Sequence, residues 1–152
     1  MTKKRVLFVC THNSARSHMA EAMVNAWAGD TFEAFSAGTE AAGIRPETVV
    51  VMEEIGLSLE GHRSKTIDEF RGQPFHWFIT VCDEAQKNCP VLPGVENVGH
   101  WSIEDPWLAT GSDKERLEAF RTARDRIRDR IRLFLLAAGR DDLPTPDAAT
   151  FG

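Results

Sequence analysis

The sequence predicts an α/β fold with an open, mainly parallel four-stranded sheet and helices on both faces. Apolar segments of strand length alternate with amphipathic segments of helical period, and no repeat or low-complexity linker separates them. The length of 152 residues suits one domain with its own core. We therefore expect a single domain over residues 1–139 and a flexible tail over residues 140–152, which contains two prolines.

The first two elements are a strand and a helix joined by a polar loop. Residues 5–10 are expected to form a strand buried on both faces, because Val6 to Cys10 are continuously apolar. The loop of residues 11–15 follows. A helix is expected over residues 16–28, because Met19, Met23 and Trp27 recur at helical spacing and Gly29 ends the pattern.

Later segments continue the alternation. Residues 32–36 indicate a second strand, and Pro46 opens a helix that ends at Gly56. Residues 76–82 and 95–101 predict the third and fourth strands. The long helix of residues 113–138 has one apolar stripe, and its opposite face is expected to be solvated; that face carries Arg121, Arg124, Arg128 and Arg132.

Composition narrows the function classes. A net charge of −5 argues against a general nucleic-acid binder. No apolar run approaches the roughly 20 residues that span a bilayer, so a cytoplasmic location is expected. Three cysteines, an odd number, favour a catalytic or redox use over structural disulfides.

A candidate anion-binding loop joins the first strand to the first helix. It has the spacing Cys-x5-Arg, and backbone N–H groups at a helix N-terminus bind tetrahedral oxyanions. The Arg16 guanidinium could grip two oxygens, and the same positive field favours the thiolate of Cys10. The alternative is that Cys10 is only a small buried apolar residue. The predicted oxyanion-binding residues are Thr11, His12, Asn13, Ser14, Ala15, Arg16 and Ser17.

Cys82 and Cys89 form a second candidate site after the third strand. Their spacing is not that of a zinc ribbon, and no second pair completes a tetrahedral site. Residues seven apart on a helix lie two turns apart, so a disulfide between them would require the segment to unwind. The alternative is two unrelated thiols. Because Cys10 and Cys82 both fall at predicted strand ends, we expect these two cysteines to meet.

Asp105 is the candidate proton donor. It lies in the sequence Glu-Asp-Pro-Trp after the fourth predicted strand, where a carboxylic acid near the anion loop could protonate a leaving oxygen. Asp-Pro is also a common turn, so local sequence alone leaves both interpretations open.

Together these motifs resemble the thioredoxin-coupled arsenate reductases of the low-molecular-weight tyrosine phosphatase fold. The resemblance runs from about Val6 to Leu136 and rests on five segments: VLFVCTHNSARSHMAEA, FSAGT, GHRSK, VCDEAQKNCP and HWSIEDP. It implies that the chain reduces arsenate, with thioredoxin as reductant, no cofactor, no nucleic-acid or membrane partner, and action as a monomer.

The resemblance also implies roles for individual residues. The Cys10 thiolate attacks arsenate held by the loop and Arg16, and Asp105 protonates the departing oxygen. Cys82 then attacks Cys10, Cys89 attacks Cys82, and thioredoxin reduces the Cys82–Cys89 disulfide. Some relatives bind potassium behind the loop through residues that match Asn13, Glu21 and Ser36 and an acid; Lys65 stands at the acid's position here. We therefore expect Lys65 to replace the ion and predict no metal.

Two other functions are compatible with parts of the pattern. A tyrosine phosphatase would use the same loop, arginine and acid, but such enzymes usually carry a second cysteine where this chain has Ala15. An oxyanion-binding redox sensor would need Cys10 but no proton donor. Among the histidines, His18 and His76 are expected at the surface or at strand ends, and His62 is expected to support a loop by hydrogen bonds.

Overall fold

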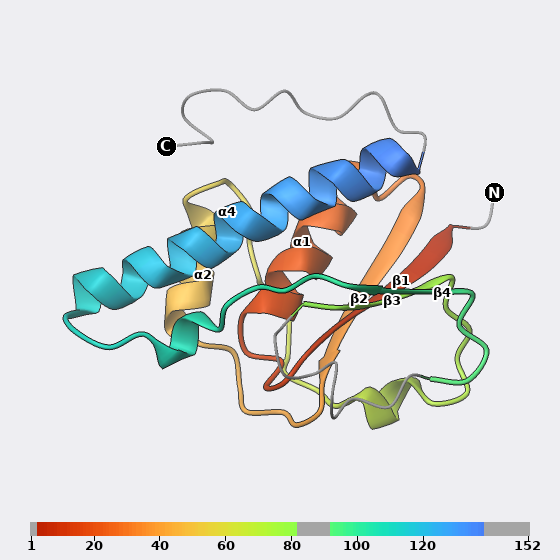
Figure 1. The fold of residues 1–152 in the computed structure, drawn as a ribbon, viewed down its shortest axis with the longest axis horizontal. Helices are drawn as coiled ribbons and strands as arrows, with labels where there is room; N and C mark the ends of the chain where they lie inside the picture. Colours follow the sequence, from red (N-terminus) through yellow and green to blue (C-terminus); the bar gives the residue numbers. More distant parts are fainter. Residues whose placement is uncertain (1–2, 82–91, 139–152) are drawn as a thin grey trace.

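The computed structural model describes residues 3–81 and 92–138. Within them, four strands form one sheet in the order β2-β1-β3-β4, and all neighbouring strands are parallel (Figure 1). The predicted open parallel sheet is confirmed. The strands are β1 (Lys4–Cys10), β2 (Phe32–Gly38), β3 (Trp77–Thr80) and β4 (Asn97–His100); the helices are α1 (Arg16–Ala28), α2 (Pro46–Glu53) and α4 (Asp113–Ala137), with short 3-10 helices η1 (Ile67–Phe70) and η2 (Pro106–Leu108).

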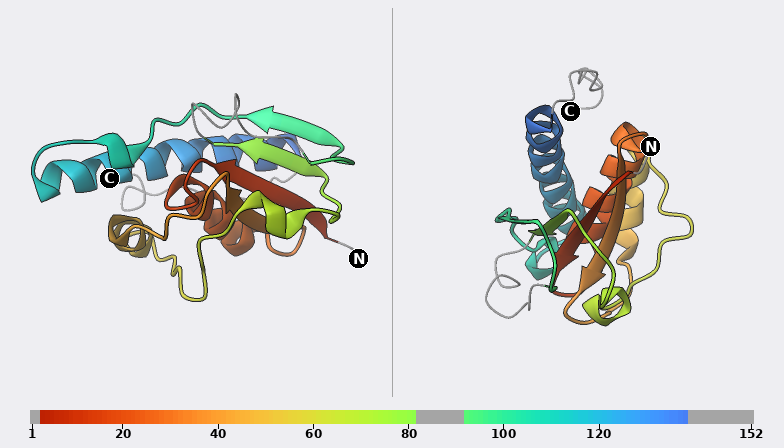
Figure 2. Two further views of the ribbon diagram at one scale, coloured as in Figure 1. Left: turned by 90° about the horizontal axis from the view of Figure 1, so that it is seen from below. Right: turned by 90° about the vertical axis from the view of Figure 1, so that its right-hand side faces the viewer.

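The core lies on both faces of β1, which explains the unbroken apolar run of this strand. Val6 and Phe8 face the cluster that contains the apolar side chains of α1, α2 and α4. Leu7 and Val9 point the other way, into a smaller cluster with η1. The three described α-helices therefore share one face of the sheet, and η1 with its flanking loops covers part of the other (Figure 2).

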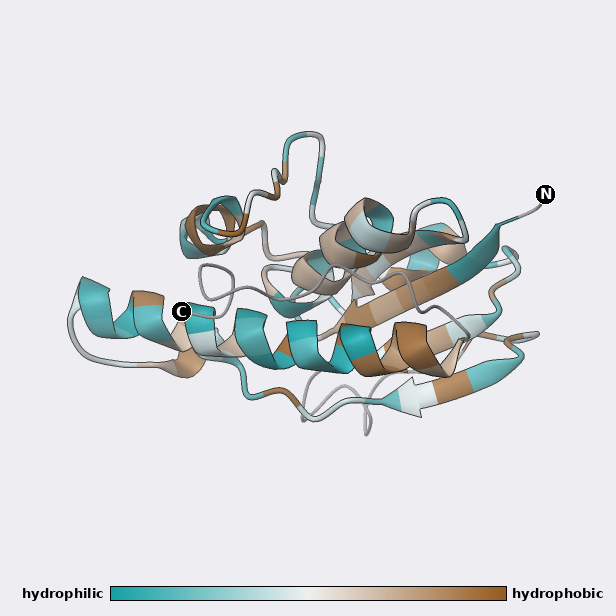
Figure 3. Cartoon of the chain, turned by 90° about the horizontal axis from the view of Figure 1, so that it is seen from above, coloured by the Kyte–Doolittle hydropathy of each residue, from teal (hydrophilic) through white to brown (hydrophobic). Residues whose placement is uncertain are grey.

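Helix α4 begins with a capping box. The Ser112 hydroxyl accepts the N–H of Glu115, and the Glu115 carboxylate accepts the N–H of Ser112. Hydrophilic and hydrophobic positions then alternate along the helix (Figure 3), and the apolar ones pack against α1 and the sheet. Among residues 3–81 and 92–138, no helix is long and apolar enough to cross a membrane.

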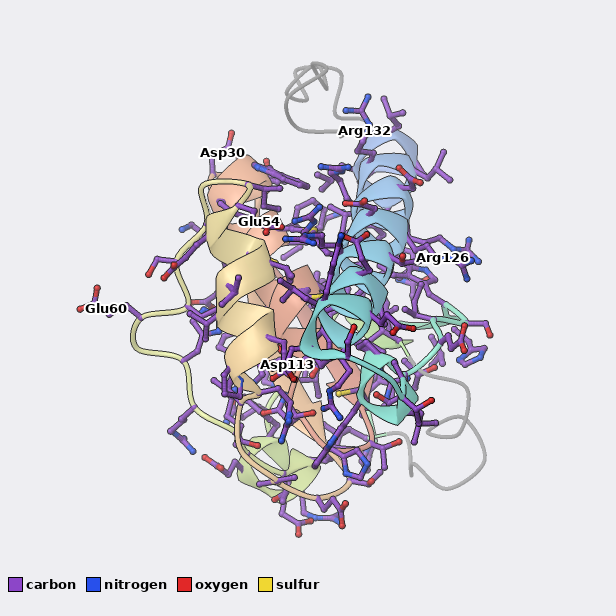
Figure 4. The ribbon with its side chains drawn as sticks, turned by 90° about the vertical axis from the view of Figure 1, so that its left-hand side faces the viewer. Asp30, Glu54, Glu60, Asp113, Arg126 and Arg132 are labelled. Carbon is purple, nitrogen blue, oxygen red and sulfur yellow. The ribbon has the colours of Figure 1, made fainter. Side chains whose placement is uncertain are left out.

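The expected solvated face of α4 is partly wrong, because Arg124 and Arg128 are buried. Helix α2 packs beside α4 and ends there, so carbonyl groups of its last turn lack partners within the helix. Arg124 donates to the carbonyl of Val51 at 2.9 Å and to the Glu54 carboxylate at 2.8 Å. Figure 4 labels Glu54 beside the space between these two helices. Periodicity alone cannot reveal this pairing.

Gly38 lets the end of β2 approach the loop after β1. A Cβ atom there would lie 2.5 Å from the Glu40 carbonyl oxygen, 2.7 Å from the Asn13 nitrogen and 2.8 Å from the Thr11 carbonyl oxygen. All three are backbone atoms, which cannot move aside as a side chain can. We therefore expect Gly38→Ala to lower the free energy of unfolding by about 1–3 kcal/mol.

Urea unfolding of Gly38→Ala checks this, with Gly99→Ala as the matched control. Gly99 also lies in a strand, but its added Cβ would meet nothing closer than Ile79 Cγ1 at 3.6 Å. Equal stability of the two variants would contradict the close packing of Gly38 against the loop.

Candidate active site

The candidate site lies at the carboxyl end of β1. The chain passes from β1 to β2 on one side and later to β3 on the other, and ligands of such sheets bind at this switch point. Cys10 is the last residue of β1 and is buried. On the neighbouring strand, the Val81 N–H donates to the Val9 carbonyl at 2.9 Å, so the residue that precedes Cys82 lies beside Cys10. Cys82, Cys89 and the tail lie outside the described residues.

The backbone of the loop has its carbonyl groups turned outward. Each carbonyl from Cys10 to Ser14 accepts a hydrogen bond from a donor outside the loop: the N–H groups of Thr39, Glu40, Ala42 and Arg45, and the hydroxyl of Ser64. Since C=O and N–H point in opposite directions across a trans peptide, the N–H groups that follow turn toward the loop interior. No side chain caps the N-terminus of α1. The loop can therefore bind an oxyanion through its backbone.

A buried hydrogen-bond chain reaches the thiol of Cys10. The Asn13 side-chain amide donates to Ser17 Oγ at 2.8 Å, and Ser17 Oγ lies 2.9 Å from Cys10 Sγ. Because Ser17 Oγ accepts from the amide, its own proton can be donated to the sulfur, and this donation favours the thiolate. Asn13 holds its place in a left-handed conformation with φ of 47°, which asparagine adopts more readily than most residues.

Arg16 and Asp105 are joined by an ion pair across the mouth of the loop. Arg16 Nη2 lies 3.4 Å from Asp105 Oδ2, and Arg16 Nη1 donates to the Ile103 carbonyl at 2.9 Å. The other oxygen of Asp105 accepts the N–H of Trp107 and caps η2. Asp105 thus forms the turn and also lies beside Arg16 of the anion loop, and its role as a proton donor stays a prediction.

Trp107 contacts His12 of the anion loop and Arg45, the residue before α2. Its ring meets His12 edge-on with 5.0 Å between centroids, and the Arg45 guanidinium lies 4.8 Å from the centre of the ring. Arg45 was not predicted from the sequence. It stands before Pro46, which signals only a helix start, and its contact with Trp107 depends on the folded chain. Because the Arg45 N–H donates to the Ser14 carbonyl at 3.0 Å, this residue brings a second cationic side chain near the loop.

Lys65 lies behind the loop. Its backbone N–H donates to Asn13 Oδ1 at 2.8 Å, and its ammonium group lies 3.2 Å from Ser36 Oγ and 3.9 Å from Glu21 Oε1. Burial lowers the pKa of Lys65, and the charge of Glu21 opposes this effect. The replacement of a potassium ion by Lys65 stays a prediction, to be tested by comparing arsenate affinity in potassium and sodium buffers.

The surface position expected for His18 is wrong. His18 has 0% exposure, because the segment before η1 covers this face of α1. Its Nε2–H donates to the Asn13 carbonyl at 3.1 Å, and the His62 ring lies on its other side. Burial lowers the pKa of His18 to about 4, although the charge of Glu21 opposes this shift.

The buried His18 predicts an acid-sensitive stability. Its folded-state pKa of about 4 lies below the ordinary value of 6.5, so the unfolded chain takes up a proton first as the pH falls. The stability present above pH 6.5 should be lost progressively toward pH 4, by on the order of 3 kcal/mol. Urea unfolding of the metal-free protein from about pH 7.5 to about pH 5.5, a range in which ordinary carboxylates stay ionised, measures the first part of this loss. His18→Gln, whose amide can still donate to Asn13, should show a shallower slope; an unchanged slope would contradict the assignment.

Comparison with known proteins agrees with this geometry. The sequence profile of the low molecular weight phosphotyrosine protein phosphatase family matches residues 5–143. The arsenate reductase of Halalkalibacterium halodurans is 40% identical over 134 residues, which are 88% of this chain and 96% of that protein.

Solved structures of arsenate reductases are also similar to this chain. An arsenate reductase in a phosphate-binding state superimposes with a TM-score of 0.72 at 31% identity, over 88% of this chain and 98% of that one. A thioredoxin-dependent arsenate reductase of Corynebacterium glutamicum has a TM-score of 0.61 at 27% identity, over 89% of this chain and 63% of that one. This chain therefore belongs to the low molecular weight phosphotyrosine protein phosphatase family and, within it, to the arsenate reductases.

Proposed function

We propose that this arsenate reductase uses Cys10, Cys82 and Cys89 as a thiol relay that thioredoxin regenerates. The observation that carries the proposal is the environment of Cys10. Its buried sulfur lies 2.9 Å from the Ser17 hydroxyl, at the base of a loop whose outward carbonyls leave the N–H groups for an oxyanion. A nucleophile so placed would face the central atom of a tetrahedral oxyanion bound by the loop.

The first step forms a bond between sulfur and arsenic. The loop N–H groups and the Arg16 guanidinium hold arsenate, whose oxygens replace Asp105 as partners of Arg16. The Cys10 thiolate attacks arsenic(V), and one oxygen leaves as water after Asp105 donates a proton. Ser17 stabilises the thiolate before the attack.

The second step carries the redox change. The Cys82 thiolate attacks the Cys10 sulfur, a disulfide forms, and the electron pair of the sulfur–arsenic bond stays on arsenic, which leaves as arsenite. Cys89 then attacks Cys82 and frees Cys10 as a thiolate. A thioredoxin dithiol reduces the Cys82–Cys89 disulfide, so two electrons enter for each arsenate consumed.

Two observations support the relay and its reductant. The chain runs beside β1 along β3 and as far as Val81, the residue that precedes Cys82 in the sequence. The similar Corynebacterium glutamicum enzyme is thioredoxin-dependent. We place the reaction in the cytoplasm, where thiols are kept reduced, and treat residues 1–139 as the working domain.

The test is NADPH consumption in a mixture of the chain, thioredoxin and thioredoxin reductase. The proposal predicts consumption that requires both arsenate and thioredoxin and yields one arsenite for each NADPH. Consumption supported equally well by glutathione and glutaredoxin without thioredoxin would contradict the proposed reductant. Hydrolysis of an aryl phosphate in place of arsenate reduction would favour the phosphatase, the alternative suggested by the Arg16–Asp105 pair.

Arg16 should contribute the geometry of its hydrogen bonds, as well as its positive charge, to arsenate binding. Arg16→Lys keeps the charge but loses the planar fork and the hydrogen bond to Ile103, so we expect kcat/KM for arsenate to fall roughly 10- to 100-fold. The coupled assay measures this, with the exposed Arg71→Lys as control. A loss of less than about threefold would contradict bidentate binding.

A further inference from the structure

We infer that His18, Glu21 and His62 form a binding site for a divalent transition-metal ion such as Zn²⁺, behind the anion loop. One ligand atom of each residue lies within 4.8 Å of the other two. His62 Nδ1 lies 3.1 Å from His18 Nδ1 and 2.8 Å from Glu21 Oε2. Three donor atoms that converge so closely, two of them imidazole nitrogens, match the ligand set of zinc sites that keep one position open.

The hydrogen bond of His18 gives this ring the tautomer that a metal needs. Its Nε2–H donates to the Asn13 carbonyl, so the lone pair of a neutral His18 lies on Nδ1, the atom that faces His62. Metal-binding histidines commonly have their second nitrogen held in this way by a backbone carbonyl. His62 now shares its Nδ1 proton with its two neighbours; a metal ion would take the place of that proton.

The site is largely preorganised. His18 and Glu21 lie three residues apart on the same face of α1, and both are buried. His62 comes from the segment before η1, whose backbone is fixed by the hydrogen bond from the His62 N–H to the Leu59 carbonyl. His62 is partly exposed, which provides a route for the ion. Ser36 Oγ, 3.4 Å from His18 Nδ1, or a water molecule could complete the coordination.

This site shares Glu21 and the nearby Ser36 with the potassium site implied by the family resemblance, but it adds the imidazole nitrogens of His18 and His62. Imidazole nitrogens suit zinc, copper and nickel, whereas hard cations prefer oxygen ligands. No metal was predicted from the sequence because Lys65 was expected to replace the potassium ion, and His18 was expected at the surface or at a strand end. Burial of His18 against Glu21 and His62 is what changes this expectation.

Lys65 should weaken the metal site. Its ammonium group lies 3.9 Å from Glu21 Oε1, so one carboxylate would face both the ion and a second positive charge. Replacing Lys65 with the uncharged methionine removes this repulsion and should tighten metal binding at least about tenfold. A metal ion would also link α1 to the 62–65 segment, which holds Asn13 through Ser64 and Lys65, and should therefore raise the melting temperature.

The test is titration of Co²⁺, and then Zn²⁺ in competition, into the full chain after metal removal, with its thiols kept reduced by a phosphine. The expected result is one ion per chain, visible cobalt bands without a sulfur-to-cobalt charge-transfer band, and a higher melting temperature. His18→Gln and His62→Gln should each weaken binding at least about 100-fold, whereas the control His76→Gln should bind as the wild type does.

Several results would overturn the inference. A sulfur charge-transfer band would assign the ion to cysteines, and an affinity equal to that of the wild type in both histidine variants would exclude the site. If a histidine variant fails to fold, as circular dichroism would show, the metal affinity of the Lys65→Met variant tests the inference instead. Tighter binding supports the site, and unchanged affinity or no binding contradicts it.

Discussion

Replacing Cys10 with serine should abolish arsenite formation, including the first turnover. A serine hydroxyl is a far weaker nucleophile than a thiolate, and an oxygen–arsenic bond offers Cys82 no sulfur to attack. We expect the amount of arsenite formed in a rapid-quench experiment with excess protein to fall by at least about 10³-fold. The substitution exchanges only one sulfur atom for oxygen at the base of the loop.

Phosphate binding distinguishes lost chemistry from a lost fold. The N–H groups of the loop and the Arg16 guanidinium remain in Cys10→Ser, so phosphate should still raise its melting temperature. Arsenite formation by a variant that binds phosphate normally would show that Cys10 is not the nucleophile. Failure to bind phosphate would instead contradict the backbone-based oxyanion site.

Replacing Cys89 with serine should stop turnover after the first cycle. Attack by Cys10 and Cys82 needs no help from Cys89, so about one arsenite per chain should still appear in a single-turnover experiment. The Cys10–Cys82 disulfide then has no internal thiol to move it, and steady-state NADPH consumption should fall at least about 10²-fold. Cys82→Ser is the matched control: it keeps Cys10 and Cys89 but should release no arsenite even once. Unchanged steady-state rates in Cys89→Ser would contradict the relay.

The sequence predicted the long elements well because their patterns are local. The apolar run of β1 and the stripe of α4 each extend over enough residues to exclude alternatives. The ends of the helices and strands were predicted less accurately than their existence. Strand β2 continues through Gly38, beyond the predicted strand of residues 32–36, because Gly38 pairs with Cys10 in the ladder. The short helices η1 and η2 were not predicted, since three or four residues carry too little pattern.

The candidate site likewise combines local motifs, which the sequence predicted, with contacts between distant residues, which it did not establish. The anion loop is contiguous in sequence, so its cysteine, its arginine and the left-handed Asn13 could all be predicted from one segment. The ion pair of Arg16 with Asp105 could be suggested but not established, because the two residues come from distant parts of the chain. His18 shows the limit most clearly: its burial depends on the 62–65 segment, and no local pattern reveals which helix face that segment covers.

Disulfide mapping after one arsenate cycle tests the relay most directly. The fully reduced chain would receive an equimolar amount of arsenate without thioredoxin, its free thiols would be alkylated, and its peptides would be analysed by mass spectrometry. The relay predicts a Cys82–Cys89 disulfide with Cys10 alkylated in the wild type, and a Cys10–Cys82 disulfide in Cys89→Ser. Arsenite formation with Cys82 and Cys89 both alkylated and no disulfide would contradict it.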